Sequence, residues 1–266
     1  MFGRPSHLVF ALALILPATA SAQGFEYAPS TGQYRISSKT KGAQEAMGQK
    51  QEFESSNDQL LTVTVARQTK DTLNVTVIID SVKAVGPMGM TPPGLDKLIG
   101  VKIAAKLAPY GAVYSAVGPT DDSIPQGAQI TDEMSRFLPR IRATKLASGS
   151  SWTDTTVGKV KQAGIDVDRR VVAKFTVLGD TTIGGEKSWK IARETTTSLS
   201  GSGTSQGQPM TMEGTANGKA TILVSQKGVF VGSSNEDQAN IKIVLAANGM
   251  EIGVTTTSNT KVEKVK

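Results

Sequence analysis

The sequence predicts a mainly β protein of the α+β class, whose long antiparallel strands form a curved sheet or half-barrel. Three observations support this fold. Apolar and polar residues alternate with a period of two over many segments. These segments are rich in β-branched side chains and are separated by short turns that contain Gly, Asn or Asp. A helical period occurs in one stretch, residues 128–142, and we expect this amphipathic helix to pack on the concave side of the sheet.

The first 22 residues have the three regions of a secretory signal peptide. Arg4 supplies a positive charge, residues 8–16 are apolar, and Ala20-Ser21-Ala22 is a small-residue cleavage site. The apolar run is too short to span a bilayer. We therefore expect cleavage after Ala22, a bacterial periplasmic or secreted location, and a mature chain that does not span a membrane. Residues 23–266 are expected to form a single β-rich domain, with two similar halves (23–148 and 149–266) as an alternative.

The amino-acid composition excludes several kinds of catalytic and metal site. The chain contains no cysteine, and its one histidine, His7, lies in the predicted signal peptide. A mature chain without His or Cys cannot form a Ser-His-Asp triad, a thiol nucleophile or a zinc site with His or Cys ligands. We predict no metal, no cofactor and no disulfide, so stability must come from apolar burial and strand pairing.

The charge pattern argues against nucleic-acid binding. The formal net charge is +6, but the basic residues are scattered and no dense basic run with interleaved aromatic residues occurs. Most of these charges are expected on solvated strand faces. Weak association with anionic headgroups or cell-wall polymers is the alternative.

The first half is expected to begin with a strand over residues 33–43. An antiparallel hairpin follows, formed by strands around residues 61–66 and 74–80 and preceded by a turn at Asn57-Asp58. Two shorter strands, over residues 101–107 and 112–117, complete this half.

Two segments of the first half are the candidates for ligand contact. Residues 86–94 form a Pro- and Gly-rich loop with two methionines, whose flexible side chains could form an apolar lid. The predicted helix follows, with Thr131 as its N-cap and with Pro139 ending or kinking it. Arginines on and just after the helix could meet an anionic group, although a solvated helix face explains them as well. The predicted ligand-binding residues are Met88, Met90, Phe137, Arg140 and Arg142.

The second half is expected to consist of strands joined by tight turns. Residues 171–177 place alternate apolar side chains on one face, and the Gly/Ser-rich residues 198–208 indicate a hairpin tip or a short flexible excursion. Turns are predicted at Asn217-Gly218 and at Asn248-Gly249, because these residues tolerate positive φ. Strands over residues 241–247 and 250–255 flank the second of these turns.

This ground plan resembles the LolA/LppX-like periplasmic half-barrel proteins. The segment Phe137-Leu138-Pro139, followed by Gly149-Ser-Ser-Trp152-Thr-Asp154, is similar to exported bacterial β-rich families of unknown function. The resemblance implies an apolar ligand cavity without signature residues. The cysteine that carries the lipid anchor in many relatives is absent here.

The function expected from these observations is non-enzymatic binding of an apolar ligand, such as a lipid or acyl chain, in the cell envelope. Apolar residues on both faces of some strands, including Val172, Leu178 and Val244, favour it. A structural or envelope-assembly module without a small ligand is the first alternative. A carboxylate-based cell-wall hydrolase is the second, although no pair of carboxylates can be identified from spacing.

Overall fold

A computed structural model describes residues 24–119, 124, 127–162, 165–205, 207–245 and 249–265. The predicted signal peptide and the predicted Asn248 turn position lie outside these ranges. Within them, no helix is both long and apolar enough to cross a membrane.

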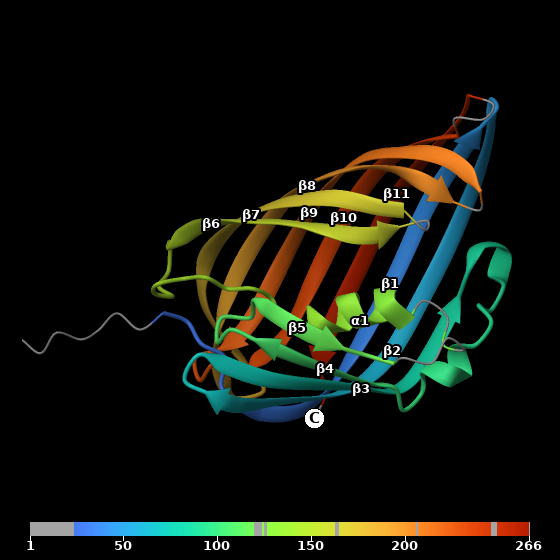
Figure 1. The fold of residues 1–266 in the computed structure, drawn as a ribbon. Coiled ribbons are helices and arrows are strands. Elements are labelled where there is room, and N and C mark those ends of the chain that lie inside the picture. The colour runs from blue at the N-terminus through green and yellow to red at the C-terminus, as the bar shows by residue number, and fades with distance from the viewer. Residues whose placement is uncertain are drawn as a thin grey trace, which may run out of the picture.

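The described chain forms one antiparallel sheet of eleven strands and one α-helix, which confirms the predicted fold class (Figure 1). The helix is α1 (Gly127–Ser135), and two 3₁₀ turns, η1 (Pro87–Gly89) and η2 (Leu95–Leu98), follow β3. The strands are β1 (Ser30–Ala46), β2 (Gln49–Thr69), β3 (Thr72–Val85), β4 (Lys102–Leu107), β5 (Val113–Val117), β6 (Ser151–Gln162), β7 (Ile165–Ile183), β8 (Glu186–Ser205), β9 (Gln208–Ser225), β10 (Phe230–Leu245) and β11 (Met250–Lys264).

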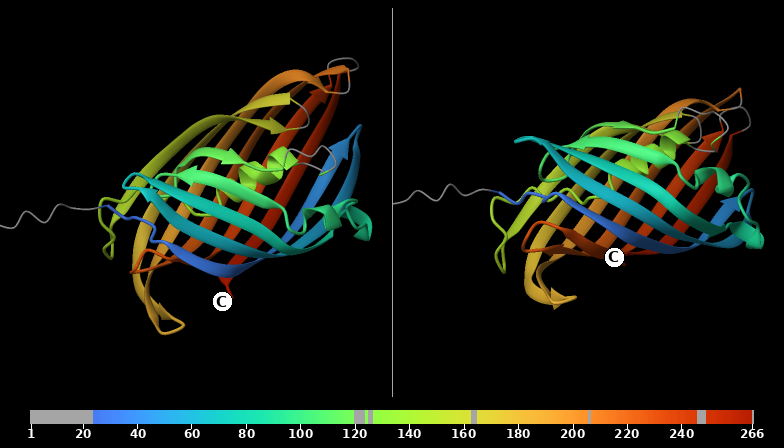
Figure 2. Two further views of the ribbon diagram at one scale, coloured as in Figure 1. Left: turned by 60° about the horizontal axis from the view of Figure 1, so that its bottom comes forward. Right: turned by 90° about the horizontal axis from the view of Figure 1, so that it is seen from below.

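The strand order is β5-β4-β3-β2-β1-β11-β10-β9-β8-β7-β6. Each half of the chain is thus a meander, and the first and last strands join the halves through a long register from Tyr34↔Lys264 to Ala46↔Ile252. The free edges are β5 and β6, which are consecutive in the sequence. In both views of Figure 2, β3 to β5 (cyan to green) curve away from the plane of β8 to β11 (orange to red). The segment between the two edge strands carries α1 into the concavity.

Alternation gives the sheet two chemically different faces. On β2 and β3, Leu61, Val63, Val75 and Val77 are buried and belong to the main apolar core. The outer face carries exposed ion pairs, such as the one between Lys242 Nζ and Glu251 Oε1 at 2.7 Å. The inner, concave face is therefore the side on which the chain buries its apolar residues.

Residues 136–142, together with residues 24–29 before β1, close the part of the concavity that lies next to Tyr34 and Phe230. The Tyr27 hydroxyl donates a hydrogen bond to the carbonyl oxygen of Pro139 (2.7 Å), and the amide of Ile141 donates to the carbonyl oxygen of Tyr110 (2.9 Å). Phe137 packs edge-on against Tyr34 and Phe230, with ring centroids 5.0 and 5.4 Å apart. These contacts form a plug between the two free edges of the sheet.

The predicted helix is correct in existence and wrong in extent. It ends at Ser135, so the residues from Arg136 to Arg142 lie outside it. The chain needs extended backbone there to reach Tyr110 and β6, and Pro139 lacks the amide hydrogen that a helix would use. Thr131 is not the N-cap, because it lies inside the helix and its hydroxyl donates to the carbonyl oxygen of Gly127 (2.7 Å).

Two predicted turns are wrong as well. Asn57-Asp58 lies within β2 and Asn217-Gly218 within β9. In β2, Asn57 faces the concavity while Asp58 accepts a hydrogen bond from the Ser37 hydroxyl on the outer face (2.7 Å). Both dipeptides are therefore continuous strand with alternating sides. The antiparallel pairing of residues 61–66 with residues 74–80 is confirmed.

Candidate functional site

The concave face contains a row of polar side chains next to the plugged core. The register Asn57↔Ser38↔Thr260↔Asn235 crosses β2, β1, β11 and β10. Beyond Asn235 of β10, the row continues through Ala220 of β9 to Arg193 of β8. The side-chain oxygens of Asn57 and Asn235 and the Nε of Arg193 are buried without a hydrogen-bond partner in the described part of the chain. We call this row, together with Asp237 one row further on, the polar belt.

Arg193 and Asp237 are the charged members of the belt. Burial lowers the pKa of the Arg193 guanidinium, and the nearby Asp237 carboxylate opposes that shift. Burial likewise raises the pKa of Asp237, and Arg193 opposes it. The two groups therefore sense each other's charge across β9, and together they leave the belt without net charge when both are ionised.

A second apolar cluster occupies the distal part of the concave face. Ile165 and Val167 of β7 and Met210 and Met212 of β9 are buried there. β8 lies between these strands and contributes Gly201, where a Cβ would lie 3.0 Å from Val167 Cγ2. The glycine thus allows side chains of β7 to reach across β8. Leu199, Ile241, Ile243 and Leu245 pack around the cluster and remain partly exposed.

Small residues line the concave face between the polar belt and this distal cluster. The register Gly42↔Thr256↔Ala239↔Ala216 crosses β1, β11, β10 and β9. These residues belong to neither apolar cluster and are partly exposed. The concave face therefore carries, in order along the strands, a plugged core, a polar belt, a strip of small side chains and an apolar cluster.

The residues predicted for ligand contact do not meet in one place. Met90 lies on the segment between β3 and β4, where its side chain is 57% exposed; Met88 lies in η1 of the same segment, and its side chain is outside the described set. Phe137, Arg140 and Arg142 lie in the plug. The guanidinium carbons of both arginines are 6.0 Å from the centroid of the Tyr110 ring.

Arg140 joins the plug to edge strand β6. Its Nε lies 2.8 Å from Asp154 Oδ2, an ion pair without an aligned hydrogen bond at Nε, and its Nη1 donates to the Thr156 hydroxyl (3.1 Å). Asp154 and Asp237 both face the concavity, with β7, β8 and β9 between their strands. Asp154 is engaged by Arg140, so the geometry does not present these two carboxylates as an adjacent pair.

Sequence reasoning did not single out Arg193 or Asp237. Alternation could have placed each on the inner face of its strand, but only the register brings them near each other. Gly218 was a usable signal, because a glycine inside a strand often marks close approach of another group.

No protein-family model matches the sequence, and no curated protein matches it. Several solved structures have a remote likeness to this chain. OccK2 (OpdF) of Pseudomonas aeruginosa has a TM-score of 0.28 and 7% identity, covering 89% of this chain and 98% of that one. A putative outer membrane lipoprotein-sorting protein domain from Vibrio parahaemolyticus has a TM-score of 0.21 and 8% identity, covering 85% and 83%. A DUF1329 family protein from Desulfovibrio piger ATCC 29098 has a TM-score of 0.18 and 7% identity, covering 85% and 84%. At these scores the likenesses carry no argument about function.

Proposed function

We propose that this protein is an exported, non-enzymatic carrier that holds an amphipathic lipid or acyl-chain ligand on its concave face. One observation carries the proposal: the inner face presents a polar belt and a distal apolar cluster, joined by a strip of small side chains. An amphiphile has the same order of parts, a polar end followed by an apolar chain.

The dimensions of the strip suit an alkyl chain. Asp237 at the belt and Ile243 at the distal cluster are six residues apart on β10, which corresponds to roughly 20 Å of extended strand. One leaflet of a bilayer has a hydrocarbon thickness of roughly 15 Å, half that of the whole core. A chain from a membrane lipid could therefore extend from the belt to the distal cluster. Ala216 and Ala239 leave room above the sheet for it, whereas the Phe53 ring of β2 lies over Gly42 at the β1 end of the strip.

The first test is mass spectrometry of organic extracts from protein purified from a periplasm without detergent. The proposal expects a stoichiometric co-purifying lipid, or uptake of a fluorescent fatty-acid analogue by the delipidated protein. A clean extract and no uptake of the analogue would contradict it and favour a structural module without a ligand.

Two neighbouring variants locate the binding face. Ala216 points into the concavity from β9, whereas Asn217, the next residue, is exposed on the outer face. Ala216→Trp should fill the strip and weaken binding of the analogue by tenfold or more. Asn217→Trp adds the same bulky group to the outer face and should leave binding unchanged. Equal effects of the two substitutions would refute binding on the concave face.

A further inference from the structure

A groove of about 1110 Å³ lies across β10, β11, β1, β2 and β3 and is bordered at one end by residues of the segment between β3 and β4. Its lining includes the pairs Ser37 and Lys39, Ser56 and Asp58, Lys83 and Val85, and Asn259 and Lys261. The members of each pair flank an inward-facing residue, such as Ser38 between Ser37 and Lys39. The inner-face neighbours of Ser38, which are Ile36 and Thr40, do not border the groove. The groove lining also contains inward-facing residues of the polar belt, namely Ser38, Asn57, Thr260 and Asn235. Strand alternation places Lys39 of β1 and Lys83 and Val85 of β3 on the outer face.

The groove has an excess of positive charge. Lys39, Lys41, Lys83 and Lys261 line it, against Asp58 and Asp96. Asp58 already has two partners. Its Oδ2 accepts a hydrogen bond from the Ser37 hydroxyl, and its Oδ1 lies 3.9 Å from Arg35 Nε.

Two of these lysines form no ion pair within the described part of the chain. Lys41 pairs with Glu54 at 3.4 Å and Lys261 with Glu263 at 2.6 Å. The side chains of Lys39 and Lys83 make no ion pair or hydrogen bond with any part of the chain that the structure describes. These two ammonium groups are free to meet an external anion.

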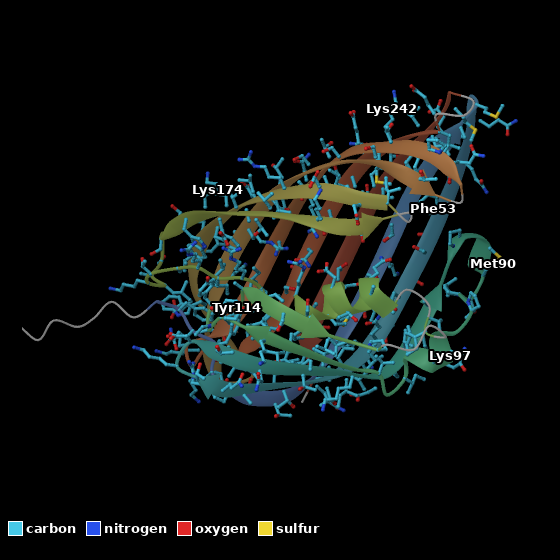
Figure 3. All side chains as sticks on the ribbon, viewed as in Figure 1. Phe53, Met90, Lys97, Tyr114, Lys174 and Lys242 are labelled. Carbon is cyan, nitrogen blue, oxygen red and sulfur yellow. The ribbon has the colours of Figure 1, made fainter. Side chains whose placement is uncertain are left out.

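Exposed apolar side chains lie at the end of the groove that is bordered by the segment between β3 and β4. Val85, Met90 and Ile99 are 46%, 57% and 54% exposed, and Val85 and Ile99 line the groove. Figure 3 shows Met90 and Lys97 on this segment, at the margin of the molecule. Apolar side chains beside unpaired lysines are typical of surfaces that lie against anionic bilayers, where lysines meet phosphates and apolar groups enter the interface.

We propose that this surface, formed by Lys39, Lys83, Val85, Met90 and Ile99, docks the protein onto an anionic lipid bilayer. The strand residues of this docking surface, Lys39, Lys83 and Val85, lie on the outer face, whereas the proposed ligand site is on the concave face. A result that contradicts bilayer docking therefore does not contradict ligand binding on the concave face, and the reverse also holds.

The test is co-sedimentation of the purified protein with vesicles made of phosphatidylglycerol and phosphatidylcholine in equal amounts, compared with pure phosphatidylcholine vesicles. Binding is expected to the anionic vesicles and to fall as salt rises. The double substitution Lys39→Glu with Lys83→Glu should weaken binding by roughly tenfold or more. Ile99→Ser should weaken it several-fold by removing an apolar contact.

Matched controls use the far half of the sheet. Lys174→Glu with Lys190→Glu makes the same change in net charge on exposed lysines of β7 and β8, and Leu178→Ser replaces an apolar side chain that is 53% exposed. Both should bind like the unmodified protein. Equal binding to the two kinds of vesicle would overturn the proposal, as would equal losses in both charge variants. A dimer in sedimentation equilibrium that Ile99→Ser abolishes would assign the surface to self-association and would overturn it too.

Discussion

Asp237 of β10 lies over Gly218 of β9, in the space that a side chain at position 218 would occupy. A Cβ there would collide with Asp237 Oδ1 and would lie 2.6 Å from the Thr195 hydroxyl oxygen of β8. The Thr195 hydroxyl is also 3.4 Å from the Gly218 carbonyl oxygen, to which it donates. Gly218 thus brings the Asp237 carboxylate close to β8 and to Arg193.

Gly218→Ala should destabilise the protein by about 1–2 kcal/mol, because Asp237 and Thr195 must both move. Urea unfolding measures this directly. Gly253 of β11 is the control, since a Cβ at that position would have nothing within 4 Å. Gly253→Ala should be neutral or stabilising by up to about 1 kcal/mol, through the lower entropy of the unfolded chain. A stable Gly218→Ala variant would refute the close approach.

The carboxyl group of Asp237 should make stability depend on pH. Its folded-state pKa is raised by burial and partly restored by Arg193. A raised pKa favours the protonated form in the fold, so its contribution is full below the unfolded value of about 3.9 and is lost as pH rises through the folded pKa. Asp237→Asn keeps the side chain uncharged. The free energy of unfolding of this variant, relative to the unmodified protein, should therefore rise from about pH 4 to about pH 7.

Urea unfolding at a series of pH values checks that trend. Glu236→Gln is the control, because Glu236 is exposed on the opposite face of the same strand. The difference in the free energy of unfolding between Glu236→Gln and the unmodified protein should change little with pH. A stability difference for Asp237→Asn that falls as pH rises would mean that attraction to Arg193 outweighs burial.

Tyr34 should give the protein an alkaline transition. Its hydroxyl donates to the carbonyl oxygen of Phe230 (2.8 Å), and burial raises its pKa to about 12. The stability from this shift is full below the unfolded value of about 10 and is lost as pH rises through 12. Tyr34→Phe should cost about 1–2 kcal/mol at pH 8, and the cost should shrink above about pH 10.

Unfolding by urea at pH 8 and at pH 11 compares these variants. Tyr114, which is 60% exposed, is the control, and Tyr114→Phe should have no effect at either pH. A pH-independent cost for Tyr34→Phe would exclude the raised pKa as its cause.

The sequence was sufficient for the buried face of several strands and for the pairing of β2 with β3, but not for the full length of β2 and β9 or for the order of the whole sheet. Alternating apolar residues in β2, β3 and β7 identify the buried face, because period two is a local property. Asn57-Asp58 and Asn217-Gly218 looked like turns because local propensity does not report a neighbouring strand. Gly218 is needed by Asp237, which is 19 positions away along the chain and adjacent in the sheet.

The proposed site was beyond the sequence for the same reason. Arg193 and Asp237 come within electrostatic range of each other through the registers of β8 with β9 and of β9 with β10, and each register depends on the whole curved sheet. The Met-containing loop and the arginines after the helix were visible locally, and whether they contact a ligand is still a prediction.

Arg140 offers a test that separates a structural role from the ligand-binding role expected from the sequence. It links the plug to Asp154, whose side chain is only 9% exposed. Removing one partner of a buried ion pair leaves the other charge uncompensated, so Arg140→Ala should cost about 2–3 kcal/mol in urea unfolding. The double variant Arg140→Met with Asp154→Leu should recover much of that loss, because neither charge is left unpaired. With a structural role, uptake of the fatty-acid analogue by the folded double variant stays at the unmodified level. A ligand-binding role instead predicts that the double variant is stable and takes up the analogue at least tenfold more weakly.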